Sequence, residues 1–235
     1  VMSEWKGKCA ALFGLQGVSL PDGVDWKSVY EKKPLGRNLL KNPAPQGTNV
    51  PPPEPKLSEV PPAPHQPALI PQGGSTEPSD YAGWSTSAEE FHYEEVRVPE
   101  GVVVCYMPRW FTLEQRVDLK AEGLWDELLD HFQPDIEIED WYEESQVHES
   151  IYQLQVQLLG ADGQTVISEH VCNPREDLEN YSHTWKQVSH TFSSYGPGVR
   201  YVHFLHKVKN SFMVEVRSTL VTGSSVKVKP SKSGL

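Results

Sequence analysis

The sequence predicts an all-β protein, an antiparallel β-sandwich with one short helix, preceded by a disordered proline-rich segment. Three observations predict this fold class. Residues 151–159 alternate apolar side chains with glutamines, as a strand with one solvated face does. Short strand-like segments follow one another with turn signals at intervals of about 8–12 residues. Twelve of the 20 prolines lie between Pro43 and Pro78, a run with almost no side chain able to pack.

The strand candidates are separated by Gly, Pro, Asn and Asp residues, which favour turns, and residues 160–163 predict a hairpin turn. In chain order the candidates are Tyr93–Val98, Gly101–Met107, Gln115–Leu119, Asp135–Tyr142, Ile151–Leu159, Thr165–His170, Trp185–Phe192, Val199–His206, Phe212–Arg217 and Ser225–Lys229. One helix is predicted over residues 123–133. Its apolar stripe consists of Leu124, Leu128 and Phe132, and the proline that follows it ends it.

Composition divides the chain into four parts. Residues 1–42 mix aromatic and basic side chains, residues 43–83 form the proline-rich linker, residues 84–230 carry nearly all of the strand patterning, and residues 231–235 are a tail. The linker has too little apolar surface to offset the entropy lost on ordering its backbone. We expect it to be extended, solvated and rich in polyproline II conformation.

The chain is acidic, with 32 Asp and Glu against 21 Lys and Arg, a net charge of -11. Binding to a phosphate backbone depends on clustered Lys and Arg, so we expect no nucleic acid partner. The acidic residues concentrate in residues 84–150, which contain 18 acidic and four basic side chains. These charges indicate solvated strand faces, with an acidic docking face for a basic partner as the alternative.

The cysteines and the apolar runs bear on location. Cys9, Cys105 and Cys172 have no CxxC spacing and one of them must be unpaired, which favours a reducing compartment over a disulfide framework. The longest apolar runs are far shorter than the roughly 20 residues needed to cross a bilayer. No basic segment precedes a signal-like core. We therefore expect a cytoplasmic protein with no membrane span.

No catalytic or metal-binding constellation is present in the sequence. The motifs GxSxG, GxxxxGK[ST], GxGxxG and HExxH are all absent. His203 and His206 lie in one predicted strand at an odd separation, so their rings point to opposite faces and are not expected to share a metal. Adjacent carboxylates such as Glu143 and Glu144 diverge in the same way. The sequence therefore predicts no enzyme, no metal and no cofactor.

The seven tryptophans and the proline spacings are the remaining candidates for binding. Trp125, Trp141 and Trp185 stand within apolar patterning and are interpreted as core residues, with stacking on a sugar ring as the alternative. The proline-rich segment contains PxxP spacings that a polyproline II helix presents to SH3 or WW domains, and a plain spacer is the alternative. The candidate docking residues are Pro52, Pro55, Pro61 and Pro64.

Residues 123–145, 151–158 and 185–206 together resemble the F-box-associated domain of the sugar-recognising F-box proteins. The resemblance extends from about Glu89 to Pro230. It implies a jelly-roll-like, galactose-binding-like β-sandwich of about ten antiparallel strands with no enzymatic centre. It also implies the substrate-recognition half of a ubiquitin ligase adaptor, with a protein or glycoprotein ligand and a link to glycoprotein quality control.

The proline-rich insertion resembles that of particular family members. The resemblance to these members implies a part in antigen recognition by fish cytotoxic cells. It also implies a cytoplasmic location and a link to cell proliferation, as in mammals. The alternative function is therefore an antigen receptor or signalling adaptor that acts through the proline-rich segment. Its alternative location is the plasma membrane of cytotoxic cells.

The sequence departs from the family in two places. Residues 5–15 and 24–34 resemble at most the C-terminal end of an F-box, so binding to the Skp adaptor of a cullin ligase is expected only if an F-box precedes Val1. Relatives that bind the chitobiose core of N-glycans have Tyr-Trp-Lys in the sugar loop, where the aromatics stack and the Lys donates a hydrogen bond. The corresponding positions here are Phe212, Met213 and Val214. The resemblance therefore predicts weak or absent chitobiose binding.

Overall fold

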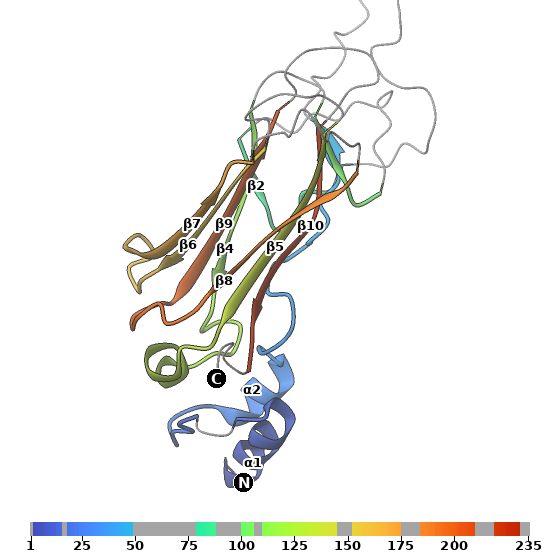
Figure 1. Ribbon diagram of the computed structural model, residues 1–235. Coiled ribbons are helices and arrows are strands. Elements are labelled where there is room, and N and C mark those ends of the chain that lie inside the picture. Colours follow the sequence, from blue (N-terminus) through green and yellow to red (C-terminus); the bar gives the residue numbers. More distant parts are fainter. Residues whose placement is uncertain are drawn as a thin grey trace, which may run out of the picture.

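The structure is a computed structural model that describes residues 2–15, 18–48, 79–87, 100–105, 110–144, 152–174, 184–209 and 219–230. Two five-stranded sheets lie face to face (Figure 1). Sheet 1 has the strand order β1-β3-β10-β5-β8, where β1 is Gly47–Thr48, β3 is Val103–Cys105, β10 is Thr219–Val228, β5 is Ile136–Glu144 and β8 is Lys186–Phe192. Sheet 2 has the order β2-β4-β9-β6-β7, where β2 is Ser85–Thr86, β4 is Phe111–Asp118, β9 is Tyr201–Val208, β6 is Tyr152–Leu159 and β7 is Val166–Cys172.

The predicted fold class, an antiparallel jelly-roll-like β-sandwich, is confirmed. The strand pairings are antiparallel except between β1 and β3, which pair in parallel. Eight of the ten predicted strands overlap the strands from β3 to β10. The other two predicted strands, Tyr93–Val98 and Phe212–Arg217, lie outside the described residues. The strand patterning of the sequence therefore located the main elements of both sheets.

Alternation along the strands builds the core between the sheets. In β6 the side chains of Leu154, Val156 and Leu158 are completely buried, while the glutamines between them are half-buried on the outer face. Strand β9 repeats the pattern with Val202 and Phe204 inward. Burying a large apolar side chain contributes about 1.5–3 kcal/mol, so these inward rows hold the sheets together.

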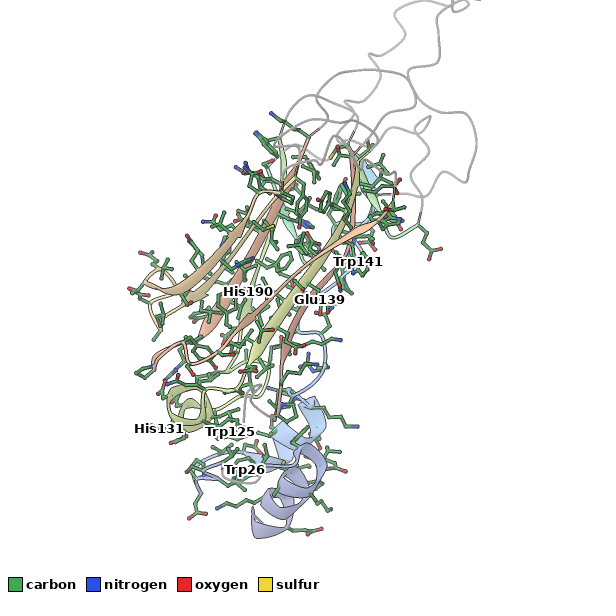
Figure 2. The ribbon with its side chains drawn as sticks, in the orientation of Figure 1. Trp26, Trp125, His131, Glu139, Trp141 and His190 are labelled. Carbon is green, nitrogen blue, oxygen red and sulfur yellow. The ribbon has the colours of Figure 1, made fainter. Side chains whose placement is uncertain are left out.

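Two helices pack at one end of the sandwich (Figure 1). They are α1, Met2–Phe13, and α2, Trp26–Lys32. The Asp25 side chain accepts a hydrogen bond from the Ser28 N–H at 3.1 Å and so caps α2. Trp26 of α2 packs edge-on against Trp125, with ring centroids 4.8 Å apart (Figure 2). This aromatic contact joins the helices to the sandwich.

The segment before β1 is also part of the folded unit. Gly36 N–H and Leu39 N–H donate to the carbonyls of Val228 and Val226, each at 2.8 Å, so this segment lies beside β10. Gly47 of β1 then pairs with Val103. The predicted division assigned residues 43–48 to the linker; in the structure the Pro43 carbonyl accepts a hydrogen bond from Ser224 N–H of β10, and Gly47–Thr48 form β1 of sheet 1. The rest of the proline-rich segment, residues 49–78, lies outside the described residues.

The predicted helix over residues 123–133 is present as a short π-helical element, η1, at Leu128–Phe132. Trp125 is buried, as predicted, but Trp141 is only half-buried and Trp185 is 37% exposed. The prediction that Trp185 is a core residue is therefore wrong, and for Trp141 it holds only in part. Along β5 the buried neighbours Asp140 and Tyr142 take the inward positions, which leaves Trp141 on the outer face.

Candidate functional site

The sequence-predicted site residues fall where the structure does not describe the chain. Phe212, Met213 and Val214 lie within residues 210–218, between the end of β9 and the start of β10. The candidate docking prolines lie within residues 49–78, and they are Pro52, Pro55, Pro61 and Pro64. Both sites therefore stay predictions, and the described residues define a different candidate site.

This candidate site is a polar cleft of about 460 Å³ along one edge of sheet 2. The short strand β2 pairs with Leu113 and Glu114 of β4, and the edge of β4 beyond this pairing borders the cleft. The other walls come from the segment before β1 and from the turn that follows β4. Its charged lining residues are Lys41, Glu114, Arg116, Asp118, Glu122 and His203.

The lining side chains alternate along β4, so Glu114, Arg116 and Asp118 share the outer face of sheet 2. Glu114 Oε2 lies 2.8 Å from His203 Nε2 on the neighbouring strand β9. The Arg116 guanidinium lies 5.0 Å from the centre of the Tyr201 ring, a cation–π contact. The cleft therefore presents both signs of charge together with hydrogen-bonding groups.

A buried glutamine holds the opposite wall in place. Gln115 Oε1 accepts from the main-chain N–H of Lys41 at 2.6 Å, and Gln115 Nε2 donates to the Lys41 carbonyl at 2.9 Å. Arg37 Nη2 pairs at 2.7 Å with Oε2 of Glu122, which lines the cleft. Because both contacts join segments far apart in sequence, the shape of the cleft is built by the fold and not by one loop.

A second polar cluster lies inside the sandwich. Asp140 Oδ2 lies 2.7 Å from His206 Nδ1 and also accepts from the Tyr152 hydroxyl, while Asp140 Oδ1 accepts from Ser224 Oγ at 2.8 Å. Burial first, and then the nearby Asp140 carboxylate, raises the pKa of Tyr152 well above its ordinary value. The four side chains are almost completely buried, so this cluster serves the core and does not meet a ligand from solvent.

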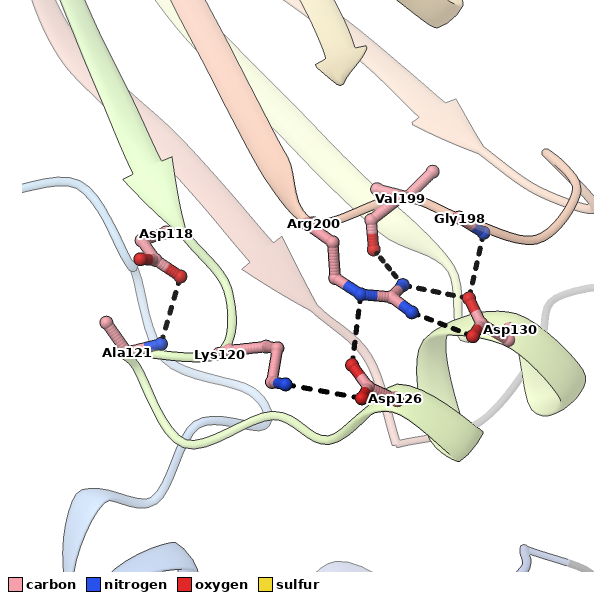
Figure 3. Close-up of polar contacts among 8 residues, drawn as sticks. All are labelled: Asp118, Lys120, Ala121, Asp126, Asp130, Gly198, Val199 and Arg200. Carbon is pink, nitrogen blue, oxygen red and sulfur yellow. Dashed lines mark hydrogen bonds and ion pairs between the residues drawn. The ribbon is translucent and has the colours of Figure 1, made fainter. Parts of the chain in front are cut away.

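A third cluster fixes η1 to the sandwich (Figure 3). Arg200 Nη2 lies 2.8 Å from Asp130 Oδ2, and Arg200 Nε lies 3.0 Å from Asp126 Oδ1. The Gly198 N–H donates to Asp130 Oδ1 at 2.8 Å. The Arg200 hydrogen bond lowers the pKa of Asp130, so the carboxylate stays charged beside its cation. These contacts explain why the short helix holds its position beside the start of β9.

The two histidines of β9 and the three cysteines bear on the chemistry predicted from the sequence. His203 faces the cleft and His206 faces the core, which confirms that the two rings point to opposite sides of β9. Within the described ranges no three His, Cys, Asp or Glu side chains are grouped so as to hold a metal ion. Burial raises the pKa of the three free thiols, which disfavours the nucleophilic thiolate at Cys9, Cys105 and Cys172.

The part of the chain that the structure describes contains no helix with both the length and the apolar composition of a membrane-spanning segment.

Sequence reasoning missed both the cleft and the buried Asp140 cluster. The signal for Asp140 was available, because it takes an inward position in the alternation of residues 136–142. The cleft had no such signal, since its walls meet only through the register of β2, β4 and the segment before β1.

Comparison with known proteins identifies the class to which this sandwich belongs. The family model described as "F-box associated region" matches residues 30–228, which is most of the chain. The chain belongs to this family, as the sequence resemblance predicted. The match begins ahead of β1, in agreement with the packing of that segment on sheet 1.

Individual relatives are similar over nearly the whole chain. The chain is 60% identical over 237 residues to F-box only protein 50 of Danio rerio, with 98% of each chain covered. It is 40% identical to F-box only protein 50 of Homo sapiens, covering 90% of this chain and 69% of the human protein. It is 31% identical to F-box only protein 44 of Homo sapiens, covering 98% of this chain and 82% of that protein.

Proposed function

We propose that the chain is a non-catalytic recognition module that binds a protein or glycoprotein ligand in the polar cleft. The family match over residues 30–228 carries this proposal. The cleft adds a place for the ligand, because an exposed strand edge offers main-chain hydrogen bonds to an extended segment. Its mixed charges favour one orientation of a polar ligand over another.

The imidazole that lines the cleft contacts a carboxylate. His203 Nε2 contacts Glu114, and no hydrogen bond from a hydroxyl or thiol to this imidazole is present among the described residues. A nucleophile and its base need to lie within hydrogen-bond reach of each other. The pair therefore supports binding through charge and hydrogen bonds.

Quantitative capture of proteins by the full chain tests whether the cleft is the binding site. We expect Arg116→Glu to reduce the captured set, because it reverses one charge on the cleft-facing side of β4. Lys27→Glu makes the same charge change on the exposed face of α2. Lys27 does not line the cleft, so capture is expected to be unchanged. Equal capture by wild type and Arg116→Glu would remove the cleft as the binding site.

The proposal includes a role in ubiquitin ligase assembly and in glycoprotein quality control. Binding to the Skp adaptor requires a complete F-box upstream of Val1, because residues 5–15 and 24–34 resemble only its C-terminal end. Pull-down of purified Skp adaptor by the full-length protein would support this role. A full-length protein that captures substrates but never the adaptor overturns it.

Chitobiose is proposed to bind weakly or not at all. A buried sugar needs directed hydrogen bonds, and an unpaired polar group costs about 1–3 kcal/mol. The family resemblance implies that sugar-binding relatives have a Lys where this chain has Val214 and an indole where it has Met213. Calorimetric titration with chitobiose is expected to show no tight saturable binding, and tight binding would place the sugar on other residues.

The alternative is an antigen receptor or signalling adaptor of nonspecific cytotoxic cells, or a regulator of cell proliferation. The PxxP spacings at residues 52–55 and 61–64 favour it, because they fit SH3 or WW grooves. Deletion of residues 49–78 tests it. Loss of SH3 or WW partners with the sandwich intact supports the adaptor function, and unchanged partners favour a plain spacer. Imaging of the full-length protein distinguishes a cytoplasmic location from the plasma membrane.

A further inference from the structure

The outer face of sheet 1 presents two tryptophans at neighbouring strands. Trp141 points outward from β5 and is half-buried (Figure 2), and Trp185 directly precedes β8 and is 37% exposed. The strand register pairs Trp141 with Gln187, two residues after Trp185. We name the surface formed by Trp141, Trp185, Glu139 and Glu143 the tryptophan face. Exposed aromatics of this size on a sheet often mark a binding surface.

The position of Trp141 is built into the sheet. Strand β10 has an irregularity between Thr222 and Ser225, where Gly223 adopts a positive φ of 66°. A Cβ atom at Gly223 would lie 2.8 Å from Trp141 Cδ1, so the indole packs directly on the main chain at a site that only glycine allows. A side chain held in this way loses little further freedom when a ligand binds.

The residues around the two indoles carry negative charge. Glu139 lies opposite Ser189 on one side and Ser225 on the other, and Glu143 lies opposite Leu220. The directly facing positions of both carboxylates therefore hold no cation. The wider segment is acidic as well, with 18 acidic and four basic residues between positions 84 and 150.

We propose that the tryptophan face binds an extended basic peptide segment of a partner protein. Lys or Arg side chains would lie over the indole faces and pair with Glu139 and Glu143, which combines cation–π attraction with charge complementarity. The inference rests on the proposed recognition function and gives the chemistry of one partner, on a surface separate from the cleft. The one lysine of β10, Lys227, lies opposite Glu137, two residues before Glu139 on the same face of β5.

The test titrates the full chain with a short synthetic peptide of alternating lysine and serine, using calorimetry at low and moderate salt. We expect saturable binding that weakens with salt. Trp185→Ala and Glu139→Gln are each expected to weaken it about two- to fivefold, the range of exposed cation–π and ion-pair contacts. Glu31→Gln on α2 removes one exposed carboxylate elsewhere and is expected to leave the affinity unchanged. Circular dichroism checks that every variant is folded.

Several results overturn the inference. One is the absence of saturable binding, and another is equal affinity of wild type and Trp185→Ala. If Asp118→Asn in the cleft loses binding and Trp185→Ala does not, the peptide binds in the cleft and not on the tryptophan face. The proposed function would still hold. Displacement of the peptide by chitobiose at Trp185 would make this a sugar site. The protein-capture experiment tests the proposed function separately, because unchanged capture by Arg116→Glu would overturn that function whatever the peptide titration shows.

Discussion

Asp140 Oδ2 on β5 lies 2.7 Å from His206 Nδ1 on β9, so one hydrogen bond joins the two sheets through the middle of the core. Both side chains have 0% exposure. The ring of His206 also stacks on Trp84, with centroids 5.2 Å apart and planes 13° from parallel. The pair therefore fixes the two sheets relative to each other with directional contacts that apolar packing does not provide.

His206→Ala is expected to lower the free energy of unfolding by about 3–5 kcal/mol, because it empties a completely buried aromatic site and removes one hydrogen-bond partner of the buried Asp140. His203→Ala removes the other histidine of β9, which contacts Glu114 on the outer face, and is expected to cost less than about 1 kcal/mol. Urea denaturation at neutral pH measures both. Equal stabilities of the two variants would show that the buried pair does not hold the sheets.

Two tryptophans test the division between core and surface. Trp26→Ala is expected to destabilise the protein by about 3–5 kcal/mol, because Trp26 is 1% exposed and packs against Trp125. Trp185→Ala is expected to change stability by no more than about 0.5 kcal/mol. Thermal unfolding compares them. A large loss of stability in Trp185→Ala would contradict its exposed position.

A histidine pair between the sheet edges predicts a loss of stability in acid. The rings of His170 on β7 and His190 on β8 stack with centroids 3.9 Å apart. Desolvation lowers the pKa of both histidines, and the charge of His190 lowers that of His170 further. Their folded pKa values lie below the unfolded value of 6.5, so their stabilising contribution is complete above that pH and is lost as the pH falls through the folded values.

The measurement is the unfolding free energy of wild type and His190→Phe between neutral pH and about pH 5. Wild type is expected to lose stability over this range more steeply than His190→Phe, which keeps a stacked ring without a second titrating group. His131→Gln, which removes an exposed histidine, is expected to follow wild type. Parallel profiles of wild type and His190→Phe would rule out the pair as the cause.

The turn between β6 and β7 predicts an unusually acidic carboxyl group. Hydrogen bonds from the Thr165 hydroxyl, and then from the main-chain N–H groups of Gln164 and Thr165, lower the pKa of Asp162 to about 2. Titration followed by NMR is expected to find this value in wild type and a higher one in Thr165→Val, which keeps the main-chain donors. An ordinary Asp pKa in wild type would contradict this turn geometry.

The sequence predicted most of the sandwich because local patterning decides which face of a strand is buried. Residues 151–159 show this clearly, since their alternation matches the burial of Leu154, Val156 and Leu158. The same rule applied to residues 136–142 places Asp140 inward and Trp141 outward. The general preference of tryptophan for the core led to the opposite interpretation, and the strand period proved to be the stronger guide.

The candidate site was less predictable, because it depends on contacts between distant parts of the chain. Gln115 holds Lys41 across 74 residues, and nothing in the sequence near either residue indicates this contact. The predicted division placed the segment before β1 outside the sandwich domain for the same reason. The hydrogen bonds from this segment to Val226 and Val228 join residues near opposite ends of the sequence. Long-range register of this kind follows from the folded arrangement and not from local pattern.

Recognition of a protein surface through the cleft requires Arg116 and does not require the N-glycans of the ligand. The most direct measurement is quantitative capture by the full chain from a protein mixture before and after enzymatic removal of N-glycans. We expect the captured set to persist after glycan removal and to be reduced by Arg116→Glu. Capture that disappears with the glycans, and that is the same for wild type and Arg116→Glu, would contradict it.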